Sequence, residues 1–174
     1  VADKLMEQGA LELIEVDMPE LELHPTTDTL IYTCNFGGYD EVKLIDAPCD
    51  CILFTDEPIE VEGWKTVVLN MQGDSRRVSR WLKINSHLLV GWKHTIYTDA
   101  RLAFVGPVDM NDWISDAPIA IHRHFVRNCI YAEATEVKNL RMDSAVVIDA
   151  QMNKYRAEGY PANYGLFENG FIVR

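Results

Sequence analysis

Short apolar runs that end in polar residues recur along the chain and predict β-strands. They are rich in β-branched and aromatic residues and comprise residues 30–34, 51–55, 64–69, 95–98 and 118–121. Such side chains favour extended, half-buried backbone. Residues 171–174 have the same character, and we interpret them as a strand whose domain continues beyond them.

Apolar residues recur at helical spacing in residues 75–89, 129–137 and 144–157, where Gly159 and Pro161 end the last segment. Strands mixed with helices indicate an α/β fold. Sheets of this kind bind ligands at the carboxyl ends of their strands. The candidate positions are therefore those that directly follow Cys34, Thr55, Thr98 and Ile121.

The first residues differ from the rest of the chain. Residues 11–23 interleave apolar side chains with Glu and Asp, which is typical of an edge strand or a solvated leader. The chain has 174 residues, 48% of them hydrophobic, which is enough for one sizeable core. We predict an acidic leader or edge segment at residues 1–27 and a single domain at residues 28–174.

The helix predicted at residues 75–89 has a basic face. No acidic residue lies between Ser75 and Thr98. At roughly 100° per residue, one face gathers basic side chains and the other apolar ones. The basic face is Arg76, Arg80, Lys83 and His87, and the apolar face is Val78, Trp81, Leu82, Ile84, Leu88 and Leu89. Asp74 is placed to cap the helix. The basic face is either merely solvated or binds an anion such as a diphosphate, because it has no carboxylates of its own.

A single acid, Asp99, directly follows the predicted strand 95–98. At the end of a buried strand a carboxylate is held rigidly, which suits a metal ligand or an acceptor for a sugar hydroxyl. The plain alternative is an Asp turn or helix cap. A metal ion needs further oxygen donors, from a diphosphate, from Asp56 or from residues outside this chain. Arg101 offers an alternative to a metal ion, because a guanidinium near the diphosphate can stabilise part of its negative charge.

Charge and cysteine content limit the partners and the compartment. The net charge of −11 argues against duplex nucleic acid or an anionic membrane surface as partner. Four cysteines are too few for a disulfide scaffold, so a reducing, cytoplasmic location is expected. No run is long enough to span a membrane, and no signal peptide is recognisable.

Several other residues have both a functional and a plain interpretation. His122 and His124 can converge on a metal, but no third ligand stands at a set spacing. Cys49 and Cys51 are more simply packed or loop thiols than ligands. The aromatic side chains near the first strand either stack on a base or pack in the core. They are Tyr32, Phe36 and Tyr39.

An ordered set of short motifs resembles one family. The motifs are Ile31–Asp40, Phe54–Asp56, Gly63–Trp64, Arg80–Ile84, Tyr97–Ala100, His122–Arg123, Cys129–Ala134 and Gly165–Arg174. Together they resemble the glycosyltransferase-like proteins once grouped as DUF616 and related to the plant TOD1/MUCI70 proteins. The resemblance implies a single GT-A-like, Rossmann-type domain with a mixed, mostly parallel sheet flanked by helices. It implies transfer of a sugar from a nucleoside diphosphate sugar, with a UDP-sugar expected, to a glycan-type acceptor, as in polysaccharide biosynthesis.

The resemblance also implies roles for particular residues. Asp99 is the surviving acid of an Asp-x-Asp-type motif that holds Mn²⁺ or Mg²⁺, but Arg101 replaces the second acid, so the metal is in question. The catalytic candidates are Asp99, Glu133 and His122. The donor-site candidates are Tyr32, Thr33, Asn35, Phe36, Gly37, Tyr39, Asp56, Arg76, Arg80, Lys83 and Arg101. The sugar or acceptor candidates are Arg123, Asp116 and Glu168.

A base for an inverting reaction would come from Glu133, Asp116 or Glu168, and a retaining reaction is equally open. Two other functions remain. The first is a nucleotide-sugar or glycan-binding module that has lost catalysis, which Arg101 and the position of Arg174 at the chain's end favour. The second is a nucleotidyltransferase, which needs two converging acids.

Overall fold

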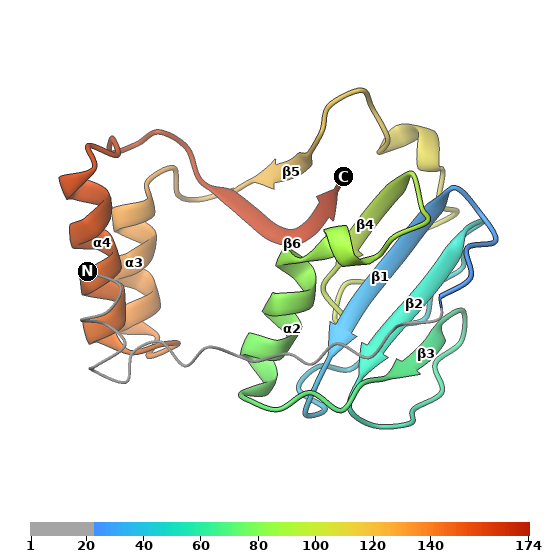
Figure 1. Ribbon diagram of the computed structural model, residues 1–174. Helices are drawn as coiled ribbons and strands as arrows, with labels where there is room; N and C mark the ends of the chain where they lie inside the picture. Colours follow the sequence, from blue (N-terminus) through green and yellow to red (C-terminus); the bar gives the residue numbers. More distant parts are fainter. Residues whose placement is uncertain (1–22) are drawn as a thin grey trace. The chain divides into compact units, whose positions relative to one another are not determined.

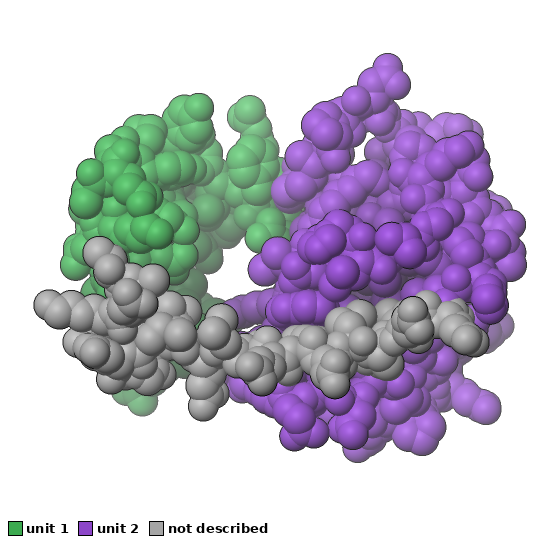
Figure 2. Space-filling model, viewed as in Figure 1, with its two compact units in different colours: residues 1–13, 122–169 green, residues 14–121, 170–174 purple. Residues whose placement is uncertain are grey.

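The computed structural model describes residues 23–174, so residues 1–22 of the predicted leader lie outside the described residues. The described residues fall into two compact units, drawn in different colours in Figure 2. One, here the sheet unit, comprises residues 23–121 and 170–174, and the other, the helical unit, comprises residues 122–169. The single domain over residues 28–174 stays a prediction.

Six strands form one sheet in the order β3-β2-β1-β4-β6-β5 (Figure 1). The strands are β1 (Thr29–Asn35), β2 (Asp50–Thr55), β3 (Lys65–Val68), β4 (His94–Thr98), β5 (Ala120–Arg123) and β6 (Phe167–Val173). Strand β1 pairs in parallel with β2 and β4, and β2 pairs in parallel with β3. Strand β6 runs antiparallel to β4. The predicted α/β fold with a mixed, mostly parallel sheet is therefore confirmed.

The helices follow the predicted segments with shifted ends. They are α2 (Ser75–Ile84), α3 (Ile130–Asn139) and α4 (Ala145–Ala157), with two 3₁₀ turns, η1 (Ser86–Leu88) and η2 (Met110–Asp112). Strand β5 also lies two residues later than its predicted run, so that His122 and Arg123 belong to the strand instead of following it.

Strand β1 is the centre of the sheet, because all seven of its residues are buried. Successive side chains of a strand point to opposite faces of the sheet. Leu30, Tyr32 and Cys34 contribute to one core cluster with Val78 and Leu82 of α2. Ile31 belongs to a second core cluster with Ile96 and Val173. Trp113 and Phe171 pack against this cluster. A central strand buried on both faces is typical of parallel sheets, and it fixes α2 firmly on one face.

Helix α2 begins as predicted and ends earlier. The Asp74 side chain accepts a hydrogen bond from the Arg77 backbone N–H, which confirms it as the N-cap. The helix ends at Ile84, and the side chain of Asn85, its C-cap, donates a hydrogen bond to the Trp81 carbonyl. Ile84 and Leu88 were predicted on the apolar face opposite the basic one, but both are exposed. Ile84 is 72% exposed, and its helical angle puts it nearer the basic face.

The helical unit has a small core of its own. Ala134 of α3 and Ile148 and Met152 of α4 are buried together, with Tyr131 and Tyr155 packed against them. Lys138 and Asp149 form an ion pair between the two helices. Ser144 takes the N-cap position of α4, where the helix was predicted to begin.

Candidate functional site

Three of the parallel strands end with polar side chains at one edge of the sheet. Asn35 closes β1, Asp56 follows β2 and Asp99 follows β4. Asn35 is paired in register with Thr55, and Tyr32 with Tyr97, so these strands end at nearly the same level. The sequence-based expectation of polar residues gathered at the carboxyl edge of the sheet is met in this unit.

Asp99 forms an ion pair with the side chain of Lys83 on α2. The Lys83 Nζ atom lies 3.3 Å from Asp99 Oδ1. The Tyr97 hydroxyl donates a hydrogen bond of 2.8 Å to the same oxygen. Both side chains are well covered, with 14% of Lys83 and 27% of Asp99 exposed. The hydrogen bonds that the Asp99 side chain accepts from the described residues thus end on Oδ1. Its other oxygen, Oδ2, lies beside Gly170.

Lys83 is fixed by its backbone as well as by its side chain. Its carbonyl accepts hydrogen bonds from Arg174 at 2.9 Å and from the Tyr32 hydroxyl at 3.4 Å. Arg174 also donates to the Tyr32 hydroxyl at 3.2 Å. The ammonium lies 4.4 Å from the centre of the Tyr97 ring. Strand β6, which ends beside Arg174, therefore fastens the last turn of α2 to the sheet.

Burial changes the protonation chemistry of this cluster. It lowers the pKa of Lys83 below the ordinary lysine value, although the Asp99 carboxylate opposes the change. It raises the pKa of Tyr32 to about 12, although Arg174 opposes that change. It also raises the pKa values of Tyr97 and Cys34 above their ordinary range. The two tyrosines and Cys34 are therefore neutral at physiological pH.

The loop after β1 is held against β2 and α2. Both carboxylate oxygens of Asp56 accept a hydrogen bond from the Gly37 backbone N–H, each at 2.9 Å. Asn35 exchanges two hydrogen bonds with the backbone of Asp40. Gly37 has a φ of +70°, and a Cβ there would lie 2.6 Å from the Ser75 hydroxyl oxygen. Only glycine fits this turn, so the loop has a fixed shape beside the start of α2.

The other predicted donor-site residues form two groups, one with buried and one with exposed side chains. Tyr32 and Phe36 are 0% and 3% exposed and pack in the core, so their rings are not available to stack on a base. Thr33 is also fully buried, and its hydroxyl has no hydrogen-bond partner among residues 23–174. Tyr39 is 73% exposed. The exposed cations are Arg76, Arg80 and Arg101.

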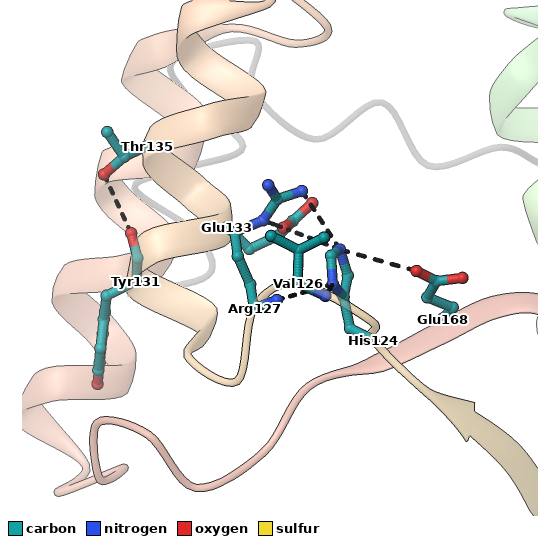
Figure 3. A network of polar contacts seen from close by, with 7 residues as sticks. All are labelled: His124, Val126, Arg127, Tyr131, Glu133, Thr135 and Glu168. Atoms are coloured by element: carbon teal, nitrogen blue, oxygen red, sulfur yellow. Dashed lines mark hydrogen bonds and ion pairs between the residues drawn. The ribbon is translucent and has the colours of Figure 1, made fainter.

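The helical unit gathers two of the predicted acids around His124 (Figure 3). His124 Nε2 lies 3.6 Å from Glu133 and 3.9 Å from Glu168. The Arg127 Nε donates to the Glu133 carboxylate, and its guanidinium lies against the same histidine. The backbone N–H groups of Val126 and Arg127 donate to His124 Nδ1 at 3.1 and 3.0 Å. Nδ1 is therefore an acceptor.

The remaining predicted residues have exposed side chains. They are His122, Arg123 and Asp116. The sequence interpretation missed Tyr97, Arg174 and Arg127, and it considered His124 only as a metal ligand. Tyr97 had a usable signal, because residues two apart on a strand share a face, so that Tyr97 and Asp99 must lie together. No sequence pattern marks the contacts of Arg174 or Arg127.

The residues present do not fit the divalent cation that the resemblance implies. Such ions take several oxygen ligands. Asp99 Oδ1 is already bound to an ammonium, and Arg101 stands where a second acid is expected. Across residues 23–174, no group of three His, Cys, Asp or Glu side chains is close enough to hold a metal ion.

Comparison with known proteins gives one match. The family model described as TOD1/MUCI70, glycosyltransferase-like domain, matches residues 50–166, which is more than half of the chain. The matched segment includes β2, α2 and β4, and it includes His124, Arg127 and Glu133 of the helical unit. Neither the curated proteins nor the solved structures give a match. None of the helices in the described part of the chain is long and apolar enough to cross a membrane.

Proposed function

The chain belongs to the TOD1/MUCI70 glycosyltransferase-like family, and on that premise we propose that it transfers a sugar from a nucleoside diphosphate sugar to a hydroxyl of a glycan-type acceptor. The observation that carries the proposal is the Lys83–Asp99 pair at the carboxyl end of β4. A rigid carboxylate and a basic helix meet there, at the edge where α/β sheets bind their ligands.

Helix α2 supplies the charges that a diphosphate needs. Arg76 and Arg80 are exposed on the same face of the helix as Lys83. Glycosyl transfer releases a nucleoside diphosphate, whose developing charge must be stabilised. Arginine binds phosphate oxygens with two parallel hydrogen bonds, and lysine binds them as a point charge. We assign Arg76, Arg80 and Lys83 to the diphosphate, with UDP as the expected nucleotide.

Asp99 is assigned to the sugar of the donor. Its Oδ1 is bound to Lys83 and Tyr97, whereas Oδ2 is available to accept a hydrogen bond from a sugar hydroxyl. When the protein binds one oxygen of a carboxylate, the other oxygen can hold a ligand in a fixed orientation. A reacting sugar must be positioned in this way.

The acceptor hydroxyl needs a base, and Glu133, Asp116 and Glu168 stay the predicted candidates for it. Glu133 is bound to the Arg127 guanidinium, so its carboxylate already has a partner. Glu168 lies 3.9 Å from His124 Nε2, and 39% of its side chain is exposed. Asp116 is the third predicted candidate, and its side chain is exposed.

One observation favours a second function, a nucleotide-sugar or glycan-binding module without catalysis. The Asp99 charge is already neutralised by Lys83, and Arg101 replaces the second acid of the motif. Such a protein would bind the donor and leave it unchanged. Turnover of a bound donor therefore separates the two functions.

The test is a thermal-shift panel of UDP-, GDP- and CMP-sugars, followed by hydrolysis of any donor that binds. A donor at a hundred times its Kd stabilises the fold by about 2.7 kcal/mol, which raises the Tm by several degrees. Asp99→Asn should weaken hydrolysis at least tenfold, and the exposed Asp112→Asn serves as the matched control. If no donor stabilises the protein, the proposed function is wrong; if donors bind without hydrolysis, the binding module is correct.

A further inference from the structure

The carboxylate at the end of β4 already has a cation beside it, and that cation belongs to the chain. The Lys83 ammonium lies 3.3 Å from Asp99 Oδ1 and 4.4 Å from the centre of the Tyr97 ring. An ammonium has three N–H donors and no acceptor. One donor suffices for Asp99, so the others can bind oxygens of a second anion.

This ammonium is held in place from several directions. The carbonyl of Lys83 is bound by Arg174 and Tyr32, which prevents the last turn of α2 from moving away from the sheet. Leu82, the preceding residue, is 1% exposed in the core. A cation fixed in this way is preorganised, so it loses little freedom when it binds an anion.

A divalent ion at Asp99 would meet this fixed positive charge. It would have to displace Lys83 from Oδ1 or bind Oδ2 within a few ångströms of the ammonium, and like charges at such separation repel strongly where water is excluded. The nearby basic side chains of α2 add to the repulsion, and the described residues hold no group of three His, Cys, Asp or Glu side chains that could offset it.

We propose that Lys83 takes the place of the divalent cation at the donor site. Its ammonium, oriented by Asp99 and Tyr97, binds the diphosphate of the donor, and donor binding needs no divalent metal. This inference rests on the proposed function, because it specifies how the same site holds its donor. Lys83 is a binding residue here, and Asp99 and Tyr97 are its positioning residues.

The test is calorimetric titration of the protein with UDP, and with GDP if UDP does not bind, in EDTA and separately in Mn²⁺. We expect the same Kd within about twofold in both buffers. Lys83→Met should weaken binding in EDTA at least tenfold, and Lys83→Arg should restore most of it. Lys65→Met is the matched control, because Lys65 is exposed and begins β3, away from the carboxyl ends of the strands. This variant should bind the nucleotide like the unaltered protein.

The outcomes separate this inference from the function on which it rests. Binding that appears only with Mn²⁺ overturns the inference and leaves the donor site intact. Unchanged binding by Lys83→Met in EDTA also overturns it. Binding of neither nucleotide in either buffer overturns the donor site and the inference together. Circular dichroism of each variant distinguishes a lost contact from a lost fold, and Lys83→Arg keeps the test valid if Lys83→Met fails to fold.

Discussion

Two aspartates at opposite ends of the parallel strands are bound in opposite ways. Asp50 begins β2, and its carboxylate accepts hydrogen bonds from the Thr26 and Thr27 backbone N–H groups, the Thr26 hydroxyl and the Trp92 indole. Asp99 follows β4, and the hydrogen bonds from the described residues to its carboxylate end on Oδ1. Both oxygens of Asp50 are used to hold segments together, whereas the carboxylate of Asp99 is bound through one oxygen.

The difference shows how a structural carboxylate is told from a functional one. Asp50 is surrounded by neutral donors, which stabilise its charge and leave it nothing further to bind. Asp99 has a charged partner on a helix whose exposed face carries more cations than anions. In α/β sheets, ligands bind at the carboxyl ends of the strands, so the position of each aspartate agrees with its contacts.

The largest effect is expected at Asp50. Asp50→Ala should lower the free energy of unfolding by about 3 kcal/mol, because it removes several hydrogen bonds to one charge and leaves the Trp92 N–H without its acceptor. Urea denaturation measures the loss. Nucleotide binding by the folded variant should be unchanged. A large loss of binding would contradict the assignment of Asp50 to structure and of Asp99 to the ligand.

A smaller effect on stability and a larger one on binding are expected at Asp99. Asp99→Asn should cost about 1.5 kcal/mol, because the amide can still accept from Tyr97 but no longer neutralises Lys83. The double variant Asp99→Asn, Lys83→Met should recover part of this loss, since no unpaired charge remains. If the two substitutions are simply additive in urea denaturation, the ion pair contributes nothing to the fold.

The smallest expected effect is the loss of stability at acidic pH that is due to Asp50. Burial opposes the charge on Asp50, but the hydrogen bonds from Thr26 and Trp92 outweigh it and lower the pKa to about 2. A lowered pKa stabilises the fold above the ordinary aspartate value of 3.8, and this contribution is lost as the pH falls towards 2. After solvent screening it amounts to about 1 kcal/mol. The difference in stability between the protein and Asp50→Asn should narrow over this range, and a constant difference would contradict the lowered pKa.

The strands and the start of α2 could be predicted because they depend on local patterns. β-rich runs such as residues 51–55 and the N-cap Asp74 are determined by side-chain chemistry within a few residues. The wrong placement of Ile84 also has a local cause. Ile84 was assigned to the apolar face because its side chain is apolar, although its helical angle lies nearer the basic face. Polar residues at strand ends correctly indicated where Asp99 and Asp56 lie.

The pairing inside the candidate site could not be predicted. Lys83 and Asp99 are 16 residues apart, and their contact depends on where α2 packs on the sheet. The basic face was expected to need anions from elsewhere, but no pattern identifies Asp99 as one of them. The clustering of Glu133 and Glu168 around His124 likewise depends on how residues 124–127 turn, with two backbone N–H groups on one ring nitrogen.

The contact between Arg174 and Tyr32 has a consequence for the time course of folding. These residues are 142 positions apart, and Arg174 also bonds to Lys83, 91 positions away. Closing such long loops is entropically costly, and non-local pairings form late and slowly. Strands β1, β2 and β4 can therefore assemble before the carbonyl of Lys83 receives its hydrogen bond from Arg174. We expect the last turn of α2 to be fastened to the sheet late in folding, when β6 docks against β4.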